Sequence, residues 1–382
     1  MNASNSEEIR ALTGLRGVAA SMVVSYHCFS QLVPVAWLRA ALSHGYIWVD
    51  CFFVLSGFIM ALSFPLPPGR GLIPRFGGFL LRRIARIWPL YLVCSLAGFV
   101  QTQTGQSVFT NFRYHAPGEL LLANLVMAQN LAWAVPWGPH GWGGSANFAA
   151  WSISTEWTAY LAYPMLYAVT LGSRRIAMLA ALIAAGALLW VAFTPLPGVI
   201  WRHGPMDVFD GNHAAATLRC MAEFTLGLLA YRVRDHRAVR AVLRNRAAAA
   251  LLFAAIVALL AWPASDLLIV ALFPPLILSL LQERAPCAAV LSRGIVYRLG
   301  VWSYAIYMVH GLFLISAAHI WVVRRWPAKL PQTLISLAAI LLLALLAHYG
   351  VERPCRRWLR HWAGGKPDRR GQGGWRSIKP AI

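Results

Sequence analysis

Apolar windows of about 20 residues recur along the chain and constrain its fold more than any other feature. Only 12% of the residues are charged, whereas a soluble domain carries about 25%. Inside a bilayer a helix satisfies its own backbone hydrogen bonds, so such windows favour spanning helices. We therefore predict an all-α fold, a polytopic transmembrane helical bundle with about ten spans, at residues 14–33, 46–64, 87–103, 150–171, 176–194, 215–231, 247–262, 265–281, 299–321 and 332–350.

The basic residues agree with this topology. With both termini cytoplasmic, 26 of the 34 Lys and Arg residues fall on the inner side and 6 on the outer side. The net charge of +21 lies in clusters between the spans, without a basic-aromatic groove pattern. We therefore expect the lipid bilayer as a partner and no nucleic acid. The seventh and eighth windows are short, and they form either two crossings or a hairpin that does not cross fully.

Two regions differ in composition. Residues 1–358 form the predicted membrane domain, and residues 359–382 a basic, Gly-rich tail that we expect to be disordered on the cytoplasmic side. The six cysteines are scattered without C-x-x-C spacing, so neither a disulfide framework nor a metal site is predicted.

The first predicted helix carries Arg16 and His27 within apolar sequence. Eleven residues make about three helical turns, so both side chains share one face about 16 Å apart. A charge within hydrocarbon costs about 2.5–3.5 kcal/mol on insertion scales, so such residues often mark function. An imidazole can take a proton from a hydroxyl, and Asp50 in the next span or Glu156 could orient it. The structural alternative is an arginine that snorkels to the interface and a histidine hydrogen-bonded within the bundle.

A group of arginines precedes the third span, in RFGGFLLRRIARIWPLYL. Arg83 and Arg86 are i, i+3 neighbours on one helical face, with Arg82 and Arg75 beside them. Guanidinium groups bind phosphate through paired hydrogen bonds, so the group suits a phosphate-bearing ligand. An ordinary inner-side cluster that binds lipid headgroups is the alternative.

Two further spans carry polar side chains at helical spacing. Their functional interpretation is the lining of a site, and the alternative is a structural hydrogen-bond network. The residues are Ser152, Glu156 and Tyr160 in one span, and Tyr304, Tyr307 and His310 in the other.

Six motifs in order resemble the acyltransferase-3 family of integral membrane O-acyltransferases, over about residues 8–358. They are LRGVAASMVVSYH, WVDCFFVLSGFIM, RRIARIWPLY, WSISTEWTAYLAYP, LGVWSYAIYMVHGLF and VERP. The resemblance implies transfer of an acyl group, most commonly acetyl, from cytoplasmic acyl-CoA to a hydroxyl of an extracytoplasmic or lipid-linked carbohydrate.

The resemblance also implies roles for individual residues. His27 matches the family's essential histidine, acting as general base or as acyl carrier. Arg16 matches its paired arginine, and Arg83 and Arg86 match the arginine motif linked to acyl-CoA, with Arg82 beside them. Acyl-CoA is then a co-substrate, and no bound cofactor is expected.

The resemblance places the protein in the bacterial cytoplasmic (inner) membrane. Some members carry a fused esterase-like domain after the last span, and because only about 30 residues follow that span here, we expect none. The alternative from another functional class is a transporter or flippase for an anionic or glycan substrate, which would also bury charges along its path.

Overall fold

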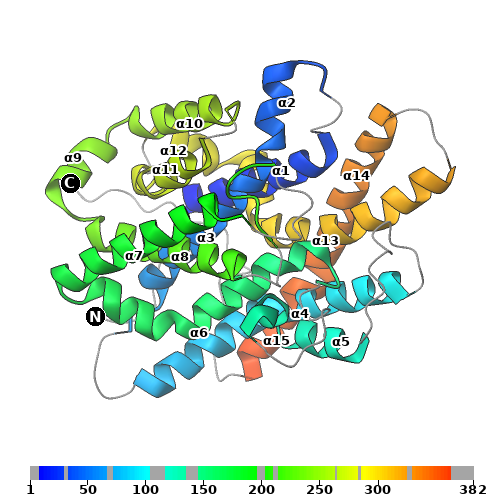
Figure 1. Cartoon of the computed structure of the whole chain (residues 1–382), viewed down its shortest axis with the longest axis horizontal. Coiled ribbons are helices and arrows are strands. Elements are labelled where there is room, and N and C mark those ends of the chain that lie inside the picture. Colours follow the sequence, from blue (N-terminus) through cyan, green and yellow to red (C-terminus); the bar gives the residue numbers. More distant parts are fainter. Residues whose placement is uncertain are drawn as a thin grey trace.

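The computed structural model describes residues 8–29, 33–66, 72–103, 117–134, 145–195, 203–209, 214–262, 265–282, 285–324 and 329–362. Every regular element in these ranges is helical (Figure 1). The all-α prediction is therefore confirmed for the part of the chain that the structure describes.

The helices of the first half are α1 (Arg10–Phe29), α2 (Ala36–Ser43), the 3-10 turn η1 (Gly45–Ile47), α3 (Trp48–Ser63), α4 (Leu72–Gln103), α5 (Pro117–Leu125), η2 (Gln129–Ala134), η3 (Phe148–Ala150), α6 (Trp151–Leu171) and α7 (Arg174–Phe193). Those of the second half are α8 (Ala215–Val233), α9 (Arg237–Leu243), α10 (Ala248–Leu259), α11 (Asp266–Ser279), α12 (Pro286–Leu291), α13 (Gly294–Arg324), α14 (Lys329–Ala347), the π-helical turn η5 (His348–Glu352) and α15 (Arg353–Trp362).

Each of the ten predicted windows coincides with one of the longer helices, namely α1, α3, α4, α6, α7, α8, α10, α11, α13 and α14. Within the described residues, four stretches are long and apolar enough to cross a membrane: Ala36–Ser63, Arg75–Gln101, Arg174–Phe193 and Pro331–Leu359. The pair α9 and α10 adds a fifth if its 71° bend lies within one span. The membrane helices are thus supported, while the number of ten spans and the cytoplasmic termini stay predictions.

Helices α10 and α11 show why the span count is open. They have 12 and 14 residues, which gives lengths of about 18 and 21 Å against a hydrocarbon core of about 30 Å. The two helices pack against each other. This arrangement is compatible with the hairpin that the sequence left as an alternative.

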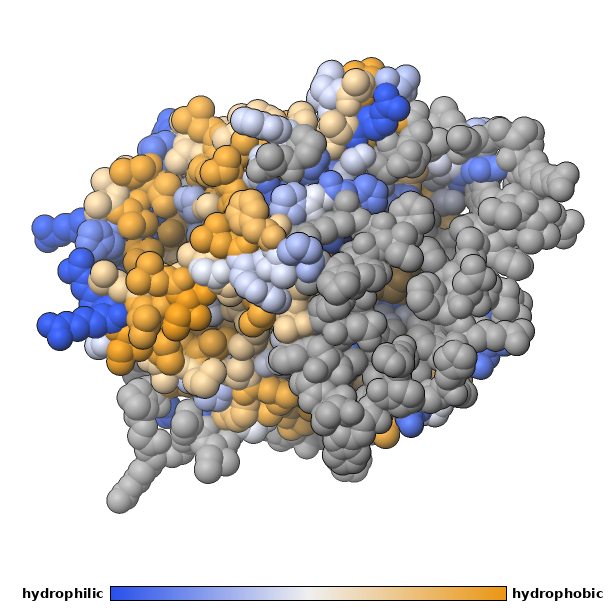
Figure 2. Space-filling model, in the orientation of Figure 1, coloured by the Kyte–Doolittle hydropathy of each residue, from blue (hydrophilic) through white to orange (hydrophobic). Residues whose placement is uncertain are grey.

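The outer surface of the bundle is apolar over α7. Leu182 and Phe193 on this helix are 69% and 75% exposed, a degree of exposure that suits contact with lipid tails. Figure 2 shows hydrophobic side chains gathered over the half of this face that contains α6, α7 and α10–α12.

Two helix pairs touch backbone to backbone. A Cβ added at Gly57 of α3 would lie 2.0 Å from the carbonyl oxygen of Phe224 on α8, and one at Gly227 of α8 would lie 2.0 Å from that of Val54. Between α1 and α13, a Cβ at Gly17 would lie 2.6 Å from the backbone nitrogen of Gly300. Small residues permit such close approach, which is how membrane helices commonly pack.

The C-terminal part differs slightly from the predicted boundary. Helix α15 continues to Trp362, four residues into the predicted tail, and residues 363–382 lie outside the described part of the chain.

Candidate functional site

A cavity opens between five helices and gathers most of the predicted site residues. It encloses about 780 Å³ of empty space, with open solvent at its mouth included. The polar and ionisable side chains that line it come from α1, α3, α4, α6 and α13, and they are Arg16, Ser56, Arg83, Arg86, Ser152, Glu156, Tyr160, Ser303, Tyr304 and Tyr307.

Three arginines line this cavity from two helices. Arg83 and Arg86 project from one face of α4, as their spacing predicts, and Arg16 joins them from α1. Arg83 is buried, and its Nε atom has no hydrogen-bond partner within the described residues. Arg82 is exposed and does not line the cavity; its guanidinium lies 4.7 Å from the ring centre of Phe64, and that of Arg83 lies 4.8 Å from the same ring. The cavity therefore concentrates positive charge and leaves a buried donor available to an anion.

One carboxylate balances part of this charge. Glu156 accepts hydrogen bonds of 2.5 Å from the hydroxyls of both Ser56 and Tyr160. Arg83 and Arg16 each interact electrostatically with Glu156 and Tyr160. Glu156 therefore belongs to the arginine end of the site.

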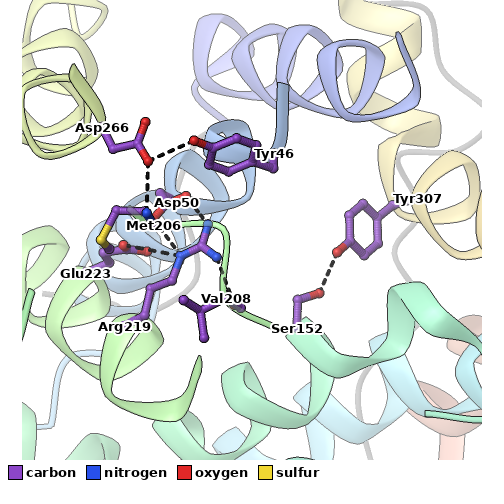
Figure 3. Close-up of polar contacts among 9 residues, drawn as sticks. All are labelled: Tyr46, Asp50, Ser152, Met206, Val208, Arg219, Glu223, Asp266 and Tyr307. Atoms are coloured by element: carbon purple, nitrogen blue, oxygen red, sulfur yellow. Dashed lines mark hydrogen bonds and ion pairs between the residues drawn. The ribbon is translucent and has the colours of Figure 1, made fainter. Parts of the chain in front are cut away.

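Helix α13 supplies the opposite wall. The hydroxyls of Tyr307 and Ser152 lie 2.8 Å apart (Figure 3). Tyr304 donates to the backbone carbonyl of Ile87, on α4, at 2.6 Å. These bonds tie α13 to α6 and α4 around the cavity.

His27 lies in the last turn of α1 and is exposed. Its Nδ1 lies 2.9 Å from the carbonyl oxygen of Val23. A carbonyl only accepts, so Nδ1 carries the proton and the neutral ring keeps its lone pair on Nε2. This is the tautomer that a general base needs, and it is fixed by the backbone of the same helix.

His310 of α13 lies beside His27, with ring centres 5.2 Å apart. It is fully buried, and its Nδ1 lies 2.5 Å from the carbonyl oxygen of Tyr307. Its Nε2 is buried without a hydrogen-bond partner in the described part of the chain. Phe148 contacts both imidazoles, at ring-centre distances of 5.1 and 5.6 Å.

The two carboxylates expected beside His27 have other hydrogen-bond partners. Asp50 is fully buried and accepts two hydrogen bonds from Arg219 of α8, one of 2.8 Å from Nε and a second from Nη2 (Figure 3). Neither Asp50 nor Glu156 is hydrogen-bonded to His27 within the described residues. The physical reason is the buried cation: Arg219 needs a carboxylate inside the bundle, and Asp50 supplies it.

The sequence analysis did not identify four residues that lie near the site, namely Arg219, Glu223, His203 and Asp207. Arg219 was visible as a charge within an apolar span, and that signal alone could have suggested a carboxylate partner. Glu223, one turn further along α8, lies 3.9 Å from the Arg219 Nε. His203 and Asp207 lie in the segment 203–209, which is not part of a helix, so no helical periodicity in the sequence connects them with α1.

The chain matches known proteins over most of its length. The family model of acyltransferase-3, described as an acyltransferase domain, matches residues 9–349. The protein named acyltransferase MdmB, from Streptomyces mycarofaciens, is 28% identical over 376 residues, which cover 91% of this chain and 92% of that protein. Protein 2 in picA locus, from Rhizobium radiobacter, is 37% identical over 95 residues, 24% of this chain and 45% of that protein. No solved structure matches significantly. The chain belongs to the acyltransferase-3 family, and it is an acyltransferase.

Proposed function

We propose that this acyltransferase moves an acyl group, most commonly acetyl in the family, from acyl-CoA to a hydroxyl of a carbohydrate. The arginine-lined cavity would hold the phosphate groups of the donor, and His27 would activate the acceptor. The acceptor would be extracytoplasmic or lipid-linked, and the protein would act in the bacterial inner membrane as part of polysaccharide modification.

The observation that carries this proposal is the layout of α1. Arg16 lines the arginine cavity, and His27 stands eleven residues further along the same helix, about 16 Å away. Coenzyme A has phosphate groups at one end and its thioester at the end of a long pantetheine arm. A donor with its phosphates on the arginines could therefore extend its thioester toward the histidines.

The fixed tautomer of His27 supports its role as general base. The Nε2 lone pair would take the proton of the acceptor hydroxyl as the oxygen attacks the thioester carbonyl, and the thiolate of coenzyme A would leave and be protonated. Attack by Nε2 itself, with an acyl-histidine intermediate, is the second possibility and uses the same atom.

The direct test is release of free thiol from acetyl-CoA by the purified full-length protein. We expect His27→Ala to reduce release by at least about 100-fold, within the range for loss of a general base. Retained release in a folded His27→Ala variant would overturn the mechanism. A transporter or flippase would release no free thiol even in the wild type.

A further inference from the structure

The segment 203–209 is fixed beside the His27 end of α1. Two buried side chains clamp it (Figure 3): Asp266 Oδ2 accepts from the Met206 backbone nitrogen at 2.8 Å, and Arg219 Nη1 donates to the Val208 carbonyl at 3.0 Å. Met206 and Val208 are fully buried. The buried pair of Arg219 and Asp50 therefore positions this segment.

Glycine at position 204 allows the segment to lie this close. A Cβ there would be 2.0 Å from the hydroxyl oxygen of Tyr46, which in turn donates to Asp266 at 2.8 Å. The segment thus packs directly on η1, next to α1.

The clamped segment presents a polar pair to α1. His203 Nδ1 lies 3.0 Å from Asp207 Oδ2 and 2.8 Å from the Tyr26 hydroxyl. Asp207 Oδ2 also accepts from the His203 backbone nitrogen at 3.0 Å, and the carboxylate is nearly buried. The hydrogen bond to Asp207 raises the pKa of His203 above its ordinary value, against a smaller opposing effect of burial.

This pair reaches His27 in two ways. The Tyr26 ring packs on the His27 ring with centres 4.6 Å apart. The contact between the Tyr26 hydroxyl and His203 therefore holds in place the aromatic ring against which the imidazole packs. Asp207 and His203 also interact electrostatically with His27, with opposite signs. Within the described residues, the charged groups that act on His27 through space therefore come from this segment.

We infer that Asp207 and His203 are positioning residues for His27, which hold Tyr26 against its ring and set how readily it takes up a proton. The inference rests on the proposed role of His27 as the proton acceptor. Asp207 then has the role of orienting the imidazole that the sequence analysis gave to Asp50 or Glu156. It acts on His27 electrostatically and through Tyr26, not by a direct hydrogen bond.

The other titratable groups around His27 do not provide this negative charge. Among the described residues, Asp207 and His203 are the charged groups that interact electrostatically with His27, whereas Asp50 is turned to Arg219 and Asp266 to Tyr46 and Met206. The remaining groups are neutral side chains or imidazoles that carry no negative charge, namely Tyr26 and Cys28 on α1, Tyr46 on η1 and His310 on α13.

The test follows the protonation of His27 without any acceptor. Diethyl pyrocarbonate modifies neutral imidazole, so mass spectrometry of the His27 peptide from full-length protein gives the pH midpoint of modification. Asp207→Asn removes a negative charge and should move this midpoint down by about half a pH unit, whereas His203→Gln removes a positive charge and should move it up by about as much. The double variant, which is neutral like the native ion pair, should return the midpoint to within about 0.2 unit of wild type.

Asp266→Asn is the matched control, because it removes a carboxylate from the same region while keeping an acceptor for Met206. We expect its midpoint to equal that of wild type. Shifts of the same sign in Asp207→Asn and His203→Gln, or no shift in Asp207→Asn, would overturn the inference. Thiol release from acetyl-CoA, measured separately on His27→Ala, tests the proposed function, so the two failures are distinguishable.

Discussion

Adjacent arginines on α4 allow a sharp test of the proposal that the cavity binds the acyl donor. Arg83 is buried and lines the cavity, whereas Arg82, one position earlier, is exposed and lies outside it. Both have the same charge and sit at the same depth along one helix. We therefore compare Arg83→Gln with Arg82→Gln, so that a general effect of charge on this helix cancels.

The expected magnitudes differ because the two environments differ. A hydrogen bond from Arg83 to a phosphate oxygen within the cavity is worth about 1.5–3 kcal/mol, which corresponds to about a 10- to 150-fold rise in the apparent KM for acyl-CoA. An exposed charge contributes about 0.2–1 kcal/mol, so Arg82→Gln should raise the KM less than about fivefold. The turnover number should change little in either variant, because neither residue lies at His27.

The assay is initial-rate thiol release over a range of acetyl-CoA concentrations, with thermal unfolding in detergent to confirm that each variant is folded. An equal KM for the two folded variants, or a larger effect from Arg82→Gln, would refute the assignment of the cavity to the donor phosphates.

Three further outcomes follow from the packing. Asp50→Asn removes the carboxylate that is hydrogen-bonded to buried Arg219, whose other acidic neighbour, Glu223, lies 3.9 Å away, and should destabilise the protein by about 3–5 kcal/mol in an unfolding titration; a loss below about 1 kcal/mol would contradict the buried ion pair. Gly227→Ala places a methyl group against the backbone of α3 and should cost about 1–3 kcal/mol, whereas Gly186→Ala on α7, where nothing lies within 4 Å, should cost nothing; equal unfolding midpoints would argue against the close contact. Tyr307→Phe removes the bond to Ser152 and should lower stability by about 1 kcal/mol, a change that thermal unfolding can detect.

Hydropathy predicts where the helices lie, because a buried or lipid-facing helix must be apolar over its whole length. The spacing of Arg83 and Arg86 likewise predicts that both face one cavity, since i and i+3 share a helical face. The same arithmetic separates Arg82 by about 100° and explains its exposure.

Pairing between helices is not encoded in any local pattern. The partner of Asp50 is 169 positions away, and it becomes visible only when α3 and α8 pack together. The segment with Asp207 reaches α1 through contacts with α8 and α11, so no spacing in the sequence predicts it. Sequence reasoning therefore found the charged groups but not which of them neutralise one another.

The glycine contacts described above bear on how a substrate could move. The pairs α3 with α8 and α1 with α13 meet backbone to backbone, and α1, α3 and α13 all line the cavity. At these glycines the two backbones are in contact, so a shift of one helix toward the other would bring backbone atoms into collision. We therefore expect the cavity walls formed by α1, α3 and α13 to keep their relative positions when a substrate binds.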